Sequence, residues 1–122
     1  MEKYRSLNAW KRAHELLLVA LRATDAAYHA RARALFDQIR RAAISVEANI
    51  VEGYALGTAP LFRRHARIAA GSAAEAECLI RAAGELGYLP SEIVTRCEKL
   101  AGDTLALLFG LLRHPPATRT YP

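Results

Sequence analysis

Four polar residues in the middle of the chain repeat at the spacing of one helix face. Arg41, Ser45, Asn49 and Glu52 are separated by steps of four, four and three residues. Side chains at such steps lie on one face, and this line runs beside an apolar stripe. We interpret it as a structural polar stripe that fixes helix register or oligomer pairing through hydrogen bonds. The alternative is an enzymatic site, which would require a deep pocket around the stripe.

Arginine is concentrated in the same part of the chain. Residues 31–67 hold seven arginines against three acidic residues, so +4 of the net charge of +5 lies there. The guanidinium group suits phosphate, and a clustered basic face is typical of nucleic-acid binding. A hairpin centred near residue 55 would set Arg67 near the level of residue 44, so that five arginines share one end of a two-helix face. The alternative is a solvated face on which Arg64 pairs with Glu47. The candidate nucleic-acid-binding residues are Arg40, Arg41, Arg63, Arg64 and Arg67.

Motifs for metal binding or catalysis are missing from the sequence. None of the Glu residues has a histidine three positions later, as a di-iron bundle requires, and no two histidines are four residues apart. The sequence also lacks a phosphate-binding glycine loop and a nucleophile elbow. His14 is interpreted as a hydrogen-bonded structural histidine. We therefore expect no catalytic residue, no metal, no cofactor and no enzymatic activity.

Composition indicates a helical protein of the cytoplasm. The chain has 122 residues, 52% of them hydrophobic, and its Ala, Leu and Arg favour helix over strand. These values exclude a disordered chain and a disulfide scaffold. Cys78 and Cys97 have no metal or redox spacing and are predicted to be small core residues of a reduced, cytoplasmic protein. The most membrane-like stretch, residues 104–112, is too short to span a bilayer, so no membrane partner is expected.

Hydrophobic periodicity and turn residues predict four helices, over about residues 6–27, 33–52, 59–86 and 91–112. Ser6 is expected to cap the first helix and Thr58 the third, while residues 53–57 end the second. Gly71 is expected to let a neighbouring helix approach closely. Short loops make consecutive helices antiparallel. The predicted fold is all-α, an up-and-down antiparallel four-helix bundle in one domain (residues 1–112) with an extended C-terminal tail (residues 113–122).

Apolar residues exceed what one bundle core needs. The core stripe of the first helix is predicted to be Leu7, Trp10, Leu17 and Leu21. Residues 16–21 and 105–112 are apolar around the whole helix, and Ile44 and Val51 lie off the main stripe of the second helix. A bundle helix that faces water needs a polar side, so these patches predict a homo-oligomer.

The sequence around the polar stripe resembles a known family. Residues 38–53, QIRRAAISVEANIVEG, are similar to the signature of the four-helix bundle proteins encoded within 23S rRNA intervening sequences. Residues 7–13, 68–72 with Glu75, and 86–89 extend the resemblance over residues 4–112. Two departures are Glu47 in place of Pro, and the small residues Ala74 and Ala76 in place of bulkier ones.

The resemblance implies an up-and-down bundle that assembles as a homopentamer and has no established enzymatic activity. A related family, the accessory proteins of diversity-generating retroelements, looks similar in fold, forms a basic pentamer, and works with a reverse transcriptase and nucleic acid. Our leading hypothesis is a non-enzymatic oligomer that contacts RNA or DNA backbone through the second and third helices. The alternative is a scaffold that recruits a partner protein without nucleic-acid contact.

Overall fold

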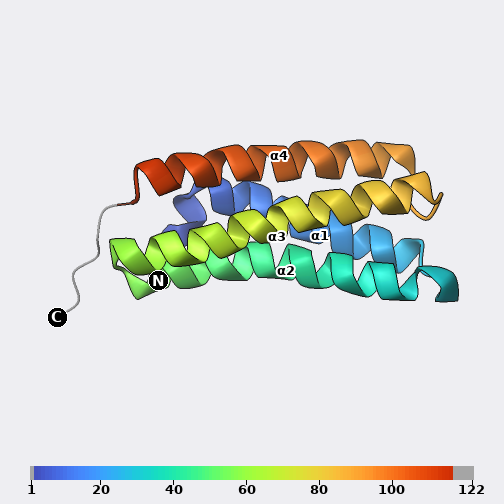
Figure 1. Cartoon of the computed structure of the whole chain (residues 1–122), viewed down its shortest axis with the longest axis horizontal. Coiled ribbons are helices and arrows are strands. Elements are labelled where there is room, and N and C mark those ends of the chain that lie inside the picture. The colour runs from blue at the N-terminus through green and yellow to red at the C-terminus, as the bar shows by residue number, and fades with distance from the viewer. Residues whose placement is uncertain (1, 117–122) are drawn as a thin grey trace.

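The computed structural model describes residues 2–116 as four long helices with two short 3-10 helices. The elements are η1 (Glu2–Ser6), α1 (Asn8–Ala26), η2 (Ala30–Ala32), α2 (Arg33–Leu56), α3 (Ala59–Glu85) and α4 (Ser91–Arg113). The described residues contain no strand. Successive long helices run in opposite directions (Figure 1), and α1 and α3 each pack against both α2 and α4. The predicted all-α, up-and-down four-helix bundle is confirmed.

The ends of the helices differ in part from the sequence prediction. The Thr58 side chain accepts a hydrogen bond from the Leu61 amide at 3.4 Å, so the predicted cap of α3 is present. Ser6 does not cap α1, because it belongs to η1 and Leu7 precedes the helix. α2 continues one turn further than expected and ends at Gly57, where φ is 78°. Only glycine adopts this left-handed conformation without strain, so Gly57 and not Gly53 ends the helix.

The C-terminal boundary also shifts. Arg113, expected at the start of the tail, is the last residue of α4. Residues 117–122 of the predicted tail lie outside the described part of the chain.

Alanine fills much of the bundle interior. Sequence periodicity predicts a core stripe of seven α3 residues, five of them alanines, and all seven are buried: Phe62, Ala66, Ala69, Ala73, Ala76, Ile80 and Ala83. On α1 the prediction was wrong: Ala9, Ala13 and Leu16 are buried, whereas Leu7 and Trp10 are only half-buried. The larger side chains lie at the flanks of the α1 interface because small residues at its centre let the helices come close. The same packing covers residues 16–21, of which none is exposed, so this segment is not the surface patch that was predicted.

Gly53 marks a close approach between α2 and α3. A Cβ atom on Gly53 would lie 2.8 Å from the Cβ atom of His65, so α2 and α3 need a glycine at this position. The prediction that Gly71 serves this purpose was wrong, since a Cβ atom there would meet nothing within 4 Å. Gly71 is exposed on α3.

We expect alanine substitutions at these two glycines to change stability in opposite directions. Gly71→Ala should raise the free energy of unfolding by about 0.5–1 kcal/mol, because alanine favours helix and has open space there. Gly53→Ala should lower it by about 1–3 kcal/mol, because the new methyl group overpacks the contact with His65. Urea denaturation at one fixed protein concentration measures both. Equal shifts in the two variants would contradict the close contact.

Candidate functional site

A polar network joins α2 to α3 along the predicted stripe. Ser45 Oγ lies 2.8 Å from Ser72 Oγ, and Asn49 Nδ2 donates to the Ser45 carbonyl and hydroxyl oxygens at 2.9 and 3.1 Å. His65 Nδ1 donates to Asn49 Oδ1 at 2.9 Å, and Glu52 Oε2 is 3.6 Å from the same nitrogen. Three of the four stripe residues are therefore linked to α3. Hydrogen bonds of this kind hold two helices in one register.

The partners of the stripe on α3 are His65 and Ser72, neither of which was predicted from the sequence. His65 and Ser72 are seven residues apart, or about two helical turns, so their side chains share a face of α3. That spacing is the sequence feature from which a matching polar face on α3 could have been predicted. Arg41, the fourth stripe residue, is exposed and has no ion pair within residues 2–116.

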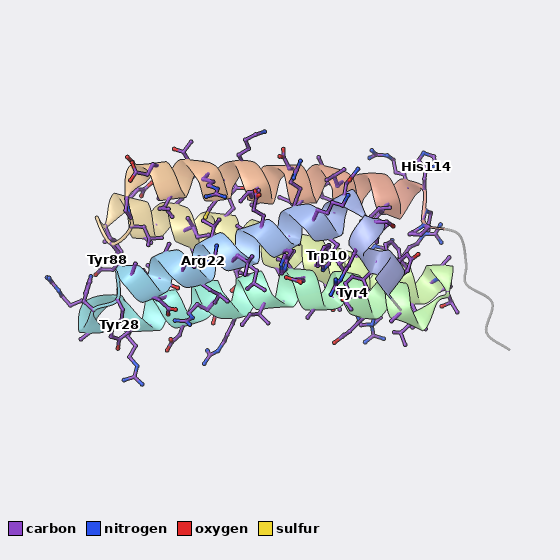
Figure 2. The ribbon with its side chains drawn as sticks, turned by 180° about the vertical axis from the view of Figure 1, so that it is seen from behind. Tyr4, Trp10, Arg22, Tyr28, Tyr88 and His114 are labelled. Atoms are coloured by element: carbon purple, nitrogen blue, oxygen red, sulfur yellow. The ribbon has the colours of Figure 1, made fainter. Side chains whose placement is uncertain are left out.

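Glu47 is the centre of a second polar group, which joins α2 to α1. Trp10 Nε1 donates to Glu47 Oε1 at 3.1 Å, and His14 Nδ1 lies 3.0 Å from Oε1 and 3.1 Å from Oε2. The Trp10 and His14 rings stack with their centroids 4.8 Å apart, and Tyr4 meets the Trp10 ring edge-on. Tyr4 and Trp10 lie together beside α2 (Figure 2).

The contacts of His14 and Glu47 test two predictions made from the sequence. His14 is hydrogen-bonded, as predicted. The suggested pairing of Glu47 with Arg64 was wrong, because the Glu47 carboxylate faces α1 and its side chain is only 17% exposed. Glu47 also occupies the position at which the resembled family pattern has proline, so a charged residue here acquires two partners on another helix.

The structure does not bring the five candidate arginines onto one face. Arg40 Nη1 donates to Asp25 Oδ1 on α1 at 2.8 Å, on the side of α2 away from α3. Arg41 follows it by about 100° around the helix and lies on the side of Ser45. Arg63 precedes Arg81 by five whole turns, and Arg81 Nη2 bonds Glu98 of α4 at 2.9 Å, so Arg63 lies on the α4 side of α3.

The arginines are also separated along the bundle. The Ser45–Ser72 and Asn49–His65 contacts place Arg67 between the levels of Ser45 and Asn49, not at residue 44 as expected. Arg41 is then about 10 Å from Arg67 along the helix axis. The expectation was wrong because α2 is one turn longer than predicted, which moves the hairpin towards Gly57.

Four of the five arginines have no acidic partner within the described part of the chain. They are Arg41, Arg63, Arg64 and Arg67. By contrast, Arg40 and Arg81 both have acidic partners, and the hydrogen bond that Arg81 donates to Glu98 raises the pKa of its guanidinium above its usual value.

Exposed apolar side chains lie among these arginines. Ile44 on α2 and Ile68 on α3 are 49% and 43% exposed, and Leu61 is 38% exposed near the start of α3. Ile68 is four residues from Arg64, so the two side chains share a stripe of α3. Val51, the other residue that was predicted off the core stripe of α2, is half-buried. The outer surface of the α2–α3 pair thus combines isolated guanidinium groups with branched aliphatic side chains.

The two cysteines have different environments. Cys97 is buried, as predicted, and desolvation raises the pKa of its thiol to about 11. Cys78 is exposed on α3, so its predicted place in the core was wrong. Within residues 2–116, no group of three or more His, Cys, Asp or Glu side chains is placed to hold a metal ion. None of the helices described has an apolar stretch long enough to cross a bilayer.

The family model for the 23S rRNA-intervening sequence protein matches residues 5–110. The chain belongs to this family. The matched region covers nearly all of the 23S rRNA-intervening sequence bundle described above, from η1 to the last turn of α4. A search of curated proteins gives no match.

The Glu47 group gives a testable expectation for this 23S rRNA-intervening sequence protein. Glu47→Ala should lower the free energy of unfolding by about 1–3 kcal/mol, because Trp10 Nε1 and His14 Nδ1 lose their acceptor. Emission from Trp10, the single tryptophan, should shift as well. Thermal and urea denaturation would measure the change. The control Glu85→Ala, at an exposed site, should change stability by less than about 0.5 kcal/mol. Wild-type stability and emission in Glu47→Ala would contradict the bridge.

Proposed function

We propose that the protein is a non-catalytic homo-oligomer that binds the phosphate backbone of RNA or DNA through arginines on α2 and α3. The observation that carries the proposal is that Arg41, Arg63, Arg64 and Arg67 have no acidic partner among the side chains that the structure describes, those of residues 4–116. A guanidinium group without a carboxylate partner keeps its hydrogen-bond donors available for phosphate oxygens. Arg40 leaves the candidate set because Asp25 binds it.

The spread of these arginines suits backbone contact better than base readout. Arg63 and Arg67 lie towards α4, whereas Arg41 and Arg64 lie on the outer surface of the α2–α3 pair. Four dispersed charges can meet successive phosphates on a curved nucleic acid, and contacts to phosphate carry no sequence information. The binding is therefore expected to depend strongly on salt and weakly on sequence. The two unpaired cysteines are in keeping with action in the cytoplasm.

Replacing three of the arginines tests the nucleic-acid proposal. Arg63→Ala/Arg64→Ala/Arg67→Ala should weaken binding to a structured RNA at about 50 mM salt by at least tenfold. The slope of log affinity against log salt concentration should also become about 2 less negative, since fewer counterions are released. Fluorescence anisotropy with labelled RNA measures both quantities.

A charge-matched variant serves as the control. Arg22→Ala/Arg31→Ala/Arg33→Ala removes three arginines that also lack an ion pair in the described structure and lie towards the opposite end of the bundle. It should retain most of the affinity. Equal loss in both triple variants would show a response to net charge alone. No binding by the wild-type protein would reject nucleic-acid contact and favour the protein-scaffold alternative.

Homo-oligomer formation is the second part of the proposal. Exposed Ile44 and Ile68 supply an apolar centre on the outer surface of α2 and α3, and arginines surround it, as is common in protein interfaces. The pentamer implied by the family resemblance is the expected assembly. In that assembly the four arginines would lie around the apolar centre and not within it, so that nucleic acid could reach them at the edge of the subunit contact.

Charged substitutions at the apolar centre test the assembly. Ile44→Glu/Ile68→Glu should shift the protein from oligomer to monomer in size-exclusion chromatography with light scattering, because two carboxylates would be buried without partners. Leu86→Glu, at a side chain that is 60% exposed in the α3–α4 loop, should leave the assembly unchanged. A monomeric wild-type protein at micromolar concentration would contradict the proposal. An unchanged oligomer in the double variant would place the contact elsewhere.

A further inference from the structure

A groove between α1 and α4 lies on the opposite side of the bundle from the α2–α3 surface. It has a volume of about 430 Å³ and is lined by the last turns of α1 and the start of α4. Its floor is apolar, formed mainly by Val19, Ala23 and Ile93. The size falls within the range of small-molecule sites in proteins.

Among the described residues, two arginines are the only charged ones that line this groove. Arg22 comes from α1 and Arg96 from α4, and no carboxylate contributes to the lining. Neither guanidinium has an ion pair in the part of the chain that the structure describes. The groove therefore has an apolar floor and two positive groups that are free to bind an anion.

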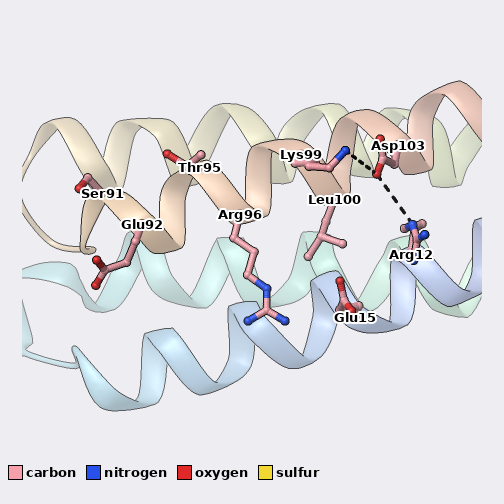
Figure 3. A pocket seen from close by; sticks show the side chains of 9 residues that line it. All are labelled: Arg12, Glu15, Ser91, Glu92, Thr95, Arg96, Lys99, Leu100 and Asp103. Carbon is pink, nitrogen blue, oxygen red and sulfur yellow. Dashed lines mark hydrogen bonds and ion pairs between the residues drawn. The ribbon is translucent and has the colours of Figure 1, made fainter.

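The register of α1 and α4 brings the two arginines to nearly the same level. Arg12 Nε lies 3.8 Å from Asp103 Oδ2, which fixes how the antiparallel helices are aligned. Arg22 is then level with about residue 93, less than one turn from Arg96. Figure 3 shows the Arg96 side chain extending from α4 towards α1, with its guanidinium between the helices. In that view Arg96 also borders a neighbouring groove, of about 650 Å³, that contains Glu15 and Glu92.

The start of α4 adds a second positive feature. Pro90 precedes the helix and lines the groove, and no side chain caps the first turn. The helix dipole gives this end a partial positive charge, which Glu92 in the first turn partly offsets. An anion between Arg22 and Arg96 would lie close to it.

We propose that this groove binds a ligand in which an apolar group adjoins a carboxylate. The apolar group would cover Val19, Ala23 and Ile93, and the carboxylate would accept hydrogen bonds from Arg22 and Arg96. A free aliphatic acid and the carboxy-terminal apolar residue of a polypeptide share this chemistry. The site is independent of the nucleic-acid surface, since it uses other helices and other arginines.

Titration calorimetry with defined probes tests this proposal on the full chain. Decanoate and an N-acetylated tetrapeptide ending in leucine represent the two sources, and decanol and the peptide amide are their uncharged controls. At least one carboxylate probe should bind with one site per chain, about tenfold or more tightly than its uncharged control. The probe that binds more tightly identifies the source. No saturable binding of either carboxylate, or equal binding of charged and uncharged probes, would overturn the proposal.

Three variants place the binding in the groove. Arg22→Gln/Arg96→Gln should weaken carboxylate binding by about tenfold or more, since both charged hydrogen bonds are lost. Ala26→Trp, at an exposed position that lines the groove, should block it without disturbing the core. Arg41→Gln/Arg64→Gln removes the same charge on the opposite side and should bind as the wild-type protein does. Equal weakening in both arginine pairs would overturn the assignment, as would full binding by Ala26→Trp.

Discussion

The close approach of α2 and α3 is the constraint on which the other features of this bundle depend. Gly53 permits it, because a methyl group there would collide with His65, and alanines along α3 maintain it towards the core. At this separation Ser45 reaches Ser72 and Asn49 reaches His65. Apolar contacts between small residues specify register weakly, so the polar pairs supply the specificity that alanine packing lacks. The register in turn determines where each charge on the two helices lies.

The charges are dispersed as a consequence of helix geometry. Adjacent arginines in sequence, such as Arg40 and Arg41, point about 100° apart and contact different neighbours. Arg40 reaches Asp25 on α1, while Arg41 on the outer surface has no acidic partner in the described part of the chain. A basic run on a bundle helix therefore produces one engaged and one available guanidinium instead of a compact cluster. Backbone binding tolerates such a distribution, because phosphates are spaced along a nucleic acid and carry no requirement for a single forked contact.

Glu47 stabilises the contact between α2 and α1 in this member of the 23S rRNA-intervening sequence protein family. Its carboxylate joins Trp10 and His14 of α1, so α2 is fixed to both of its neighbours by polar contacts. The α1–α4 side has no comparable network at its loop end. There the last turns of α1 carry small alanines, and a groove that Arg22 and Arg96 line lies between them and the start of α4. The two sides of the bundle thus differ in chemistry: hydrogen bonds join α2 to its neighbours, whereas two arginines line the groove between α1 and α4.

The sequence by itself determined the fold class, the helix order, the Thr58 cap and the core stripe of α3, because periodicity and turn residues act locally. It also located the polar line of Ser45, Asn49 and Glu52, since spacing along one helix is a local property. The partners of these residues, the separation of the arginines and the exposure of Cys78 were decided only by the tertiary structure. Each depends on the register of helices distant in sequence, and one extra turn of α2 was enough to shift that register. A local sequence pattern shows which face of a helix is buried, but it does not determine how that helix is aligned with its neighbour.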